Sequence, residues 1–279
     1  MKRARLSFLL GLCLIGAAVV SPAWAQTPSP SADSIADRVR AALKECDSAW
    51  NELAFVSVTH ERELDGDGKV NKETVYRSRV YARHDQQHEF LEGIWENGQP
   101  VSDAKLREEQ KDHEKQWKKS VKERQKEKAD RDAGKQSDES QGKSFQMMDP
   151  FRERHRNDYD FTPITPDTLA GRSVWKIGIQ PRRESEDLFR GNVWVTADAY
   201  RPLAEEYELA KLPSGVKGMR MRFDHVSLPS GCSFPQHVLM RAHGRALLVI
   251  KFNMEVETQM DSVQVNPGLP DSLFTVGAD

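Results

Sequence analysis

The sequence predicts a mainly β fold of the α+β class, an antiparallel sheet covered by an N-terminal helix and carrying a long charged helical insertion. Three observations predict it. Many segments alternate apolar and polar side chains with a period of two, as in strands with one apolar face. Turn residues separate these segments at intervals of about 10 to 18 residues, which favours an antiparallel meander. One amphipathic stretch precedes them and is placed to cover the apolar face of the sheet.

The first 25 residues have the features of a cleavable signal peptide. Basic side chains precede an apolar stretch from Leu6 to Val20, and Ala23-Trp24-Ala25 supplies the small-x-small cleavage pattern. We expect cleavage between Ala25 and Gln26 and export to the periplasm or an equivalent envelope space. The apolar stretch is shorter than the ~20 residues that a membrane-spanning helix needs. Residues 26–279 are therefore predicted to be one domain without a transmembrane span.

Composition and cysteine content bear on the class of partner and on the state of the cysteines. The formal net charge is −2 in a chain that is 30% charged, so no overall basic field favours nucleic acid as a partner. After removal of the signal peptide two cysteines remain, Cys46 and Cys232. An oxidising compartment permits them to form a disulfide, and two buried unpaired thiols are the alternative.

The N-terminal part predicts a helix and then a β-hairpin. Apolar side chains recur every three or four residues from Ile35 to Leu53, including Trp50, and Ser34 with Asp37 resembles a capping box. From Phe55 the period changes to two. Residues 65–68, Asp-Gly-Asp-Gly, form a turn between one strand ending near Leu64 and another over residues 73–83, with a third strand over residues 89–95. A calcium loop is the weaker interpretation of this turn, because the other EF-hand ligands are missing.

Residues 102–143 form a highly charged insertion. Its first part, to Arg131, predicts a solvated helix whose thin apolar stripe consists of Leu106, His113, Trp117 and Val121. Basic side chains predominate from Lys115 to Lys128. The second part is polar and contains Gly and Ser, which predicts disorder.

A second β region begins near Phe161. Its strands contain Trp175 to Ile179, Val193 to Val195, Leu203 to Leu209, Met219 to Phe223 and Leu248 to Val256. The expected turns are at Pro181, Asp198, Pro213 to Gly215, Pro229 to Gly231 and His243-Gly244.

Catalytic and metal-binding chemistry is not predicted. His84 and His88 lie four residues apart, but no third ligand is near them in the sequence, and we interpret them as a solvated pair. Ser230 to Ser233 contains two serines and a cysteine without the strand-to-helix turn of a nucleophile elbow. The sequence thus predicts a protein that is not an enzyme and that needs no cofactor.

Three segments resemble the outer-membrane lipoprotein-sorting superfamily, the carriers of the LolA type. They are Trp194-Val195-Thr196-Ala197-Asp198-Ala199-Tyr200-Arg201-Pro202-Leu203, Val265-Asn266-Pro267-Gly268-Leu269-Pro270-Asp271-Ser272-Leu273-Phe274, and Leu169-Ala170-Gly171-Arg172 leading to Trp175-Lys176-Ile177. The resemblance covers residues 161–276 best and residues 34–95 more loosely. It implies an unclosed, strongly curved half-barrel in which helices cover a hydrophobic cavity, and members with known roles hold acyl chains there. This chain departs from those carriers in its insertion at residues 102–143, and none of its arginines matches their gating position.

Two functions follow as hypotheses. The first is a periplasmic carrier or binding protein for a lipid acyl chain, a lipoprotein or another hydrophobic ligand. Its candidate cavity residues are Trp50, Met219, Met221, Phe223, Phe252 and Met254. The second is a ligand-free interaction protein whose half-barrel is filled by its own side chains and whose charged helix docks an envelope partner or a membrane surface.

Overall fold

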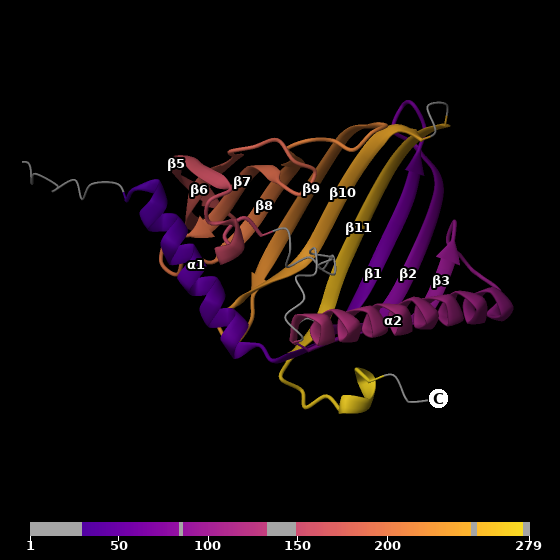
Figure 1. The fold of residues 1–279 in the computed structure, drawn as a ribbon. Coiled ribbons are helices and arrows are strands. Elements are labelled where there is room, and N and C mark those ends of the chain that lie inside the picture. The colour runs from indigo at the N-terminus through magenta and orange to yellow at the C-terminus, as the bar shows by residue number, and fades with distance from the viewer. Residues whose placement is uncertain (1–29, 84–85, 133–148, 247–249, 276–279) are drawn as a thin grey trace, which may run out of the picture. The chain divides into compact units, whose positions relative to one another are not determined.

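One antiparallel sheet contains the eleven strands of the described residues, which are 30–83, 86–132, 149–246 and 250–275 of the computed structural model. The strand order is β4-β3-β2-β1-β11-β10-β9-β8-β7-β6-β5. Within β1–β4 and within β5–β11, strands that follow each other in the sequence are neighbours in the sheet. β1 pairs with the last strand, β11. β4 and β5 lie at opposite edges, so the sheet is open, and it is curved in Figure 1. The predicted antiparallel half-barrel is confirmed.

The elements have the following bounds. The strands are β1 (Glu52–Leu64), β2 (Val70–Arg83), β3 (Gln86–Glu96), β4 (Gln99–Pro100), β5 (Tyr159–Leu169), β6 (Arg172–Pro181), β7 (Phe189–Thr196), β8 (Pro202–Leu209), β9 (Val216–Ser227), β10 (Ser233–Ala246) and β11 (Ile250–Val265). The helices are α1 (Ala32–Ala49) and α2 (Asp103–Asp132), with short 3₁₀ turns at Glu153–His155 and Asp271–Leu273. The predicted signal peptide and residues 133–143 of the insertion lie outside the described residues, which resume at residue 149.

Helix α1 lies across one face of the sheet, which we call the concave face (Figure 1). Its N-cap is Ser31, whose side chain accepts a hydrogen bond from the backbone N–H of Ser34 at 3.2 Å. The predicted start at Ser34 was therefore three residues too late. The predicted end was wrong as well, because Trp50 is the C-cap residue and Leu53 belongs to β1. A helical spacing of apolar side chains had continued by coincidence into the strand.

The main core lies between α1 and the concave face. Ile35, Ala36 and Val39 of α1 are fully buried. The strands contribute Phe161, Ile177, Ile179, Phe189, Val193, Val195, Tyr207, Met221, Phe223, Phe234, Val238 and Met260 to the same cluster. Burial of a large apolar side chain contributes about 1.5–3 kcal/mol, so this packing, more than helix propensity, holds α1 in place.

The predicted hairpin and third strand are confirmed by β1, β2 and β3. In the turn, the carboxylate of Asp65 accepts hydrogen bonds from the backbone N–H groups of Asp67 and Lys69, both at 2.9 Å. The predicted turn at His243-Gly244 was wrong, because both residues belong to β10. A Cβ on Gly244 would lie 2.2 Å from the carbonyl oxygen of Gly215. The glycine is needed for close packing within the sheet and not for a reversal of the chain.

Helix α2 contacts β3 through a narrow side. Val121 is buried, and Trp117 stacks on His88 with ring centroids 3.7 Å apart. His88 also bonds to the carbonyl oxygen of Leu273 at 2.8 Å and lies 3.3 Å from a carboxylate oxygen of Glu114. The interpretation of His88 as solvated was therefore wrong, since only 5% of it is exposed. His84 lies outside the described residues.

The opposite, convex face carries a chain of ion pairs across six strands. Arg62 on β1 donates to Glu73, Glu255 and Glu257 at 2.7–2.8 Å. The chain continues through His237, which bonds to Glu257 and Asp224, and through Arg222, which bonds to Asp224 and Glu206. Hydrogen bonds from Arg62 lower the pKa of Glu73 and Glu257. The polar positions of the alternating strands thus neutralise one another across strand boundaries.

Candidate functional site

The strand register places five of the six candidate cavity residues on the concave face, in rows that cross β9, β10 and β11. The rows are Met219–Ala242–Met254, Met221–Met240–Val256 and Phe223–Val238–Thr258, and Phe252 lies beside Gly244 at the next position. Period-two alternation on each strand fixes the face, and the pairing aligns the strands. Residues more than thirty positions apart in the sequence therefore form one apolar surface.

Burial along these rows is graded. Met221 and Phe223 belong to the packed core, with 4% and 6% of their surface exposed. Met219 is half-buried and packs against that core. Phe252 is half-buried and Met254 is 37% exposed, and neither belongs to the cluster under α1. The concave face thus changes from a filled core at Met221 and Phe223 of β9 to more exposed apolar side chains at Phe252 and Met254 of β11. We call these two residues the open row of β11.

Trp50 is separate from the other five. It follows the last turn of α1, where its ring packs edge-to-face against Phe234 with centroids 6.3 Å apart. Its indole N–H points toward the hydroxyl of Ser230 at 3.4 Å. Trp50 therefore fixes the end of α1 against the start of β10, whereas the apolar rows begin at Val238, further along that strand.

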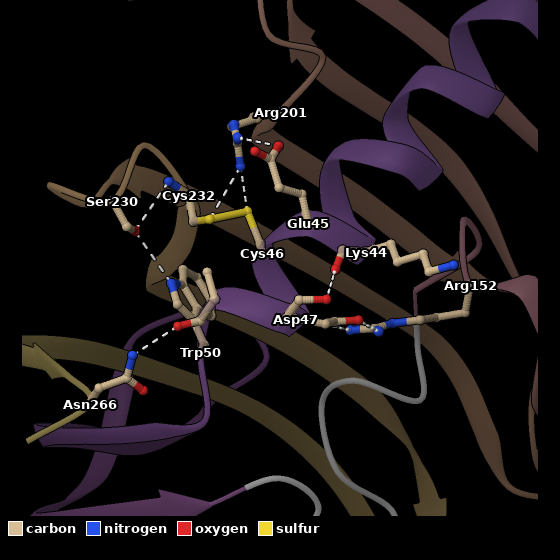
Figure 2. Close-up of a disulfide and its surroundings, with 12 residues drawn as sticks. Lys44, Glu45, Cys46, Asp47, Trp50, Arg152, Arg201, Ser230, Cys232 and Asn266 are labelled. Atoms are coloured by element: carbon tan, nitrogen blue, oxygen red, sulfur yellow. Dashed lines mark hydrogen bonds and ion pairs between the residues drawn. A yellow bond between two sulfur atoms is a disulfide. The ribbon is translucent and has the colours of Figure 1, made fainter. Parts of the chain in front are cut away.

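A disulfide between Cys46 and Cys232 fastens the same end of α1 to the turn between β9 and β10. Of the two alternatives that the sequence left open, the structure has the bonded one. Figure 2 shows the guanidinium of Arg201 beside both sulfur atoms, with Nη1 3.2 Å from Sγ of Cys232. Arg201 also pairs with Glu45 at 3.0 Å. The cover of the concave face is thus held covalently at its C-terminal end.

Beyond Met254 the concave face becomes polar. A hollow of about 270 Å³ lies beside this side chain, and it is lined by Glu61, Arg62, Glu63, Lys72, Thr74, Tyr76, Glu96, Lys105 and Glu109. Lys105 of α2 pairs with Glu96 of β3 at 2.8 Å across it. Burial raises the pKa of the Tyr76 hydroxyl. The sequence analysis missed this hollow, although Glu61 and Glu63 continue the inward-facing positions of β1.

A second polar group lies within the core. Glu205 on β8 faces the interior and lies 3.1 Å from Nε2 of His225 on β9. Tyr207 is 2% exposed, and burial raises the pKa of its hydroxyl well above the ordinary value. Burial and the charge of Glu205 raise the pKa of Asp149 to about 6. The period of β8 places Glu205 on the apolar face, but a local pattern does not show that Asp149 lies near it.

Neither group is arranged as a metal site. Among residues 30–83, 86–132, 149–246 and 250–275, no three His, Cys, Asp or Glu side chains are grouped closely enough to hold a metal ion. Within the same ranges, no helix is long and apolar enough to cross a membrane. What the described part of the chain offers is two apolar side chains of β11, Phe252 and Met254, with a polar hollow beside Met254.

Comparison with known proteins gives distant structural likenesses. No family model and no curated protein matches the chain. A DUF1329 family protein from Desulfovibrio piger is 11% identical over 88% of this chain and 98% of its own, with a TM-score of 0.42. A putative outer membrane lipoprotein-sorting protein domain from Vibrio parahaemolyticus is 12% identical over 88% and 97%, with a TM-score of 0.40. A LolA superfamily protein from Nitrosomonas europaea is 14% identical over 89% and 99%, with a TM-score of 0.38.

The last two are described with the superfamily that the sequence segments resemble. Likenesses of this degree say nothing about a ligand or a partner. The architecture rests on this chain's own strand order and register.

Proposed function

We propose that this chain is an exported, non-enzymatic binding protein or carrier that holds the hydrocarbon part of a lipid, of a lipoprotein or of another hydrophobic ligand on the open row of β11. The observation that supports the proposal is the row itself. Phe252 and Met254 continue the apolar face of the core beyond the side chains that pack under α1, and Met254 is 37% exposed. Met is well suited to such a surface, because its flexible side chain adapts to irregular ligands.

The size of the expected affinity follows from the buried area. Each methylene group that a ligand buries contributes about 0.8 kcal/mol. About ten buried methylenes would contribute about 8 kcal/mol, which corresponds to a micromolar dissociation constant before the entropic cost of association is subtracted. Association itself costs at least about 4 kcal/mol, so one acyl chain alone gives weak and reversible binding, and reversibility is what a carrier needs.

The polar hollow beside Met254 indicates that the ligand has a polar end as well as a hydrocarbon part. Its lining mixes carboxylates with Lys72 and Lys105, and Lys105 is brought there by α2. A polar headgroup would lie in this hollow while the chain lies along β11. The ligand class that fits both parts is an amphipathic lipid or a lipid-modified peptide.

An envelope location agrees with the predicted signal peptide and with the disulfide. Disulfides persist in exported proteins and are rare in the reducing cytoplasm. We therefore place the binding function in the periplasm or an equivalent compartment, in the mature chain of residues 26–279.

The test is native mass spectrometry with lipid extraction on residues 26–279 purified from a periplasm without detergent. We expect the wild type to carry a lipid, and we expect Met254→Asp to lose it because a carboxylate in the row must be desolvated when the chain binds. The matched control is Val70→Asp, which places the same charge on another exposed apolar residue, 52% exposed, at the hairpin tip.

Retention of lipid by Met254→Asp would exclude the β11 row as the site. A ligand-free mass for the wild type, unchanged after incubation with lipid vesicles, would favour the second hypothesis, a ligand-free module that binds an envelope partner.

A further inference from the structure

Seven cationic side chains of α2 gather on one side of the helix. The cationic side chains of this side, which we call the basic stripe, are Arg107, Lys111, Lys115, Lys118, Lys119, Lys122 and Lys126. Glu114 and Glu123 lie at the two margins of this side. Glu108 and Asp112 lie on the same side at 100° per residue, so seven cations share this surface with four carboxylates, in a chain whose net charge is −2.

The contacts of α2 with the sheet orient the stripe outward. The narrow side that contains Trp117 and Val121 packs toward β3, and the side-chain amide of Gln110 donates to the carbonyl oxygen of Leu91 at 2.9 Å. At 100° per residue the basic stripe is centred well over 90° away from this side. The lysines of the stripe are accordingly exposed.

Most of these cations have no counter-ion in the described part of the chain. Lys118 lies 3.5 Å from Glu114 and Lys119 lies 3.8 Å from Glu123. No ion pair joins the other five, Arg107, Lys111, Lys115, Lys122 and Lys126, to a residue that the structure describes. On the convex face, by contrast, Arg62 alone has three carboxylate partners.

The spacing within the stripe works against the helix. Lysines lie four residues apart in four pairs, 111/115, 115/119, 118/122 and 122/126. Like charges at this spacing are neighbours on the helix surface and destabilise it. A helix that is only solvated would be more stable with alternating signs, so the stripe is the feature that an external anionic partner would compensate.

We propose that the basic stripe of α2 docks the protein on an anionic phospholipid surface. Six of its seven cations are lysines, which act as mobile point charges, whereas specific bidentate recognition of a phosphate favours arginine. The stripe extends over about 28 Å along a helix, a length and straightness that match a flat surface. It contains no large apolar side chain, so the helix lies on the headgroups without inserting. This contact needs no ligand on β11 and is independent of the binding function proposed above.

The experiment is co-sedimentation of residues 26–279 with vesicles. We expect binding to phosphatidylglycerol mixed with phosphatidylcholine at about 0.05 M salt, loss of binding at about 0.5 M salt, and no binding to pure phosphatidylcholine. The test variant is Lys111→Glu with Lys115→Glu and Lys122→Glu, for which we expect an affinity about 100-fold lower, at about fivefold per cation removed.

The matched control reverses three exposed lysines outside the stripe, Lys44, Lys69 and Lys251, and so makes the same change in net charge. Circular dichroism verifies that both triple variants fold. The proposal requires that the control keeps the wild-type affinity. An equal loss in the control, equal binding to pure phosphatidylcholine, or the absence of wild-type binding at low salt would each overturn it.

Discussion

The convex face and α2 solve the same electrostatic problem in opposite ways. Both are rich in charge. On the convex face every charge of the series of ion pairs from Arg222 to Arg62 has an opposite charge within hydrogen-bond distance, and all the pairs except Arg222–Asp224 join different strands. On α2 the cations of the basic stripe follow one another along a single helix, and most of them have no ion-pair partner among the residues that the structure describes.

We infer from this difference that the ion pairs of the convex face stabilise the fold, whereas the cations of the basic stripe bind an external anionic surface. Paired charges across strands fix the register and gain little from an external partner. Unpaired like charges on a helix lower its stability and gain from an anionic surface. The predictions below test this distinction, from the largest expected effect to the smallest.

Of the substitutions predicted here, removal of Arg62 should cause the largest loss of stability. Arg62→Ala leaves Glu73, Glu255 and Glu257 facing one another without their shared cation. The side chain is 20% exposed, so we expect a loss in the free energy of unfolding of about 2–3 kcal/mol, between the values for exposed and buried ion pairs. Urea denaturation at neutral pH measures it.

Two control variants compare the loss of Arg62 with the loss of more exposed cations. Arg77→Ala removes an arginine that is 51% exposed and has one carboxylate partner, and Lys122→Ala removes a cation of the stripe. Both should change the free energy of unfolding by less than about 0.5 kcal/mol. Equal losses in the three variants would show that the convex network has no special role in stability.

Asp149 is the counterexample beside the core, a carboxyl group that is desolvated and near Glu205, although Arg152 lies 3.5 Å from it. Its pKa is raised from 3.8 to about 6, so the unfolded chain ionises first as the pH increases. The folded state therefore loses stability from about pH 4 to about pH 6, and the loss is complete above that range. Asp149→Asn should remove this loss and stabilise the protein by about 2 kcal/mol at pH 8, a value reduced for its 21% exposed side chain.

The same variant should be within about 0.3 kcal/mol of the wild type at pH 3.5, where Asp149 is mostly protonated in both states. Asn retains the oxygen that accepts the N–H of Phe151 at 2.9 Å. Thermal denaturation at the two pH values is sufficient. Equal stabilisation at both values would mean that the effect does not come from ionisation.

Local patterns predicted the faces of the elements better than their partners. Period-two alternation placed Met219, Met221 and Phe223 on one face of β9, and helical spacing placed Trp117 and Val121 on one side of α2. The pairing of β1 with β11, which closes the convex network, joins residues about 190 positions apart, as in the bond between Arg62 and Glu255. No local pattern encodes such a register.

The degree to which each apolar side chain is buried could not be predicted from the sequence either. Met221 and Met254 have the same side chain and lie on the same face, yet one is in the core and the other is 37% exposed. The difference depends on how far α1 extends over the sheet. His88 shows the same limit, because its burial requires Trp117 of α2 and the C-terminal carbonyl of Leu273.

His237 makes part of the convex network dependent on pH. Although burial acts to lower its pKa, hydrogen bonds to Glu257 and Asp224 raise it above the ordinary value. A raised histidine pKa gives stability that is present below the pKa of the unfolded chain and is lost as the pH rises through the folded value. His237→Gln should therefore destabilise the protein by about 1 kcal/mol more at pH 5.5 than at pH 9, as measured by urea denaturation. A penalty independent of pH would show that the imidazolium charge does not contribute.

The smallest effect should come from α2, and its sign should be opposite. Lys115→Glu removes repulsion with Lys111 and Lys119 and replaces it by attraction at the same spacing. We expect the free energy of unfolding to increase by about 0.5 kcal/mol at low salt and to return toward the wild-type value at about 0.5 M salt. Gln116→Glu, which introduces the same carboxylate one residue away and outside the stripe, is the control. If Lys115→Glu destabilises the protein while Gln116→Glu does not, the cations of α2 serve the fold, and the distinction between the two charged regions fails.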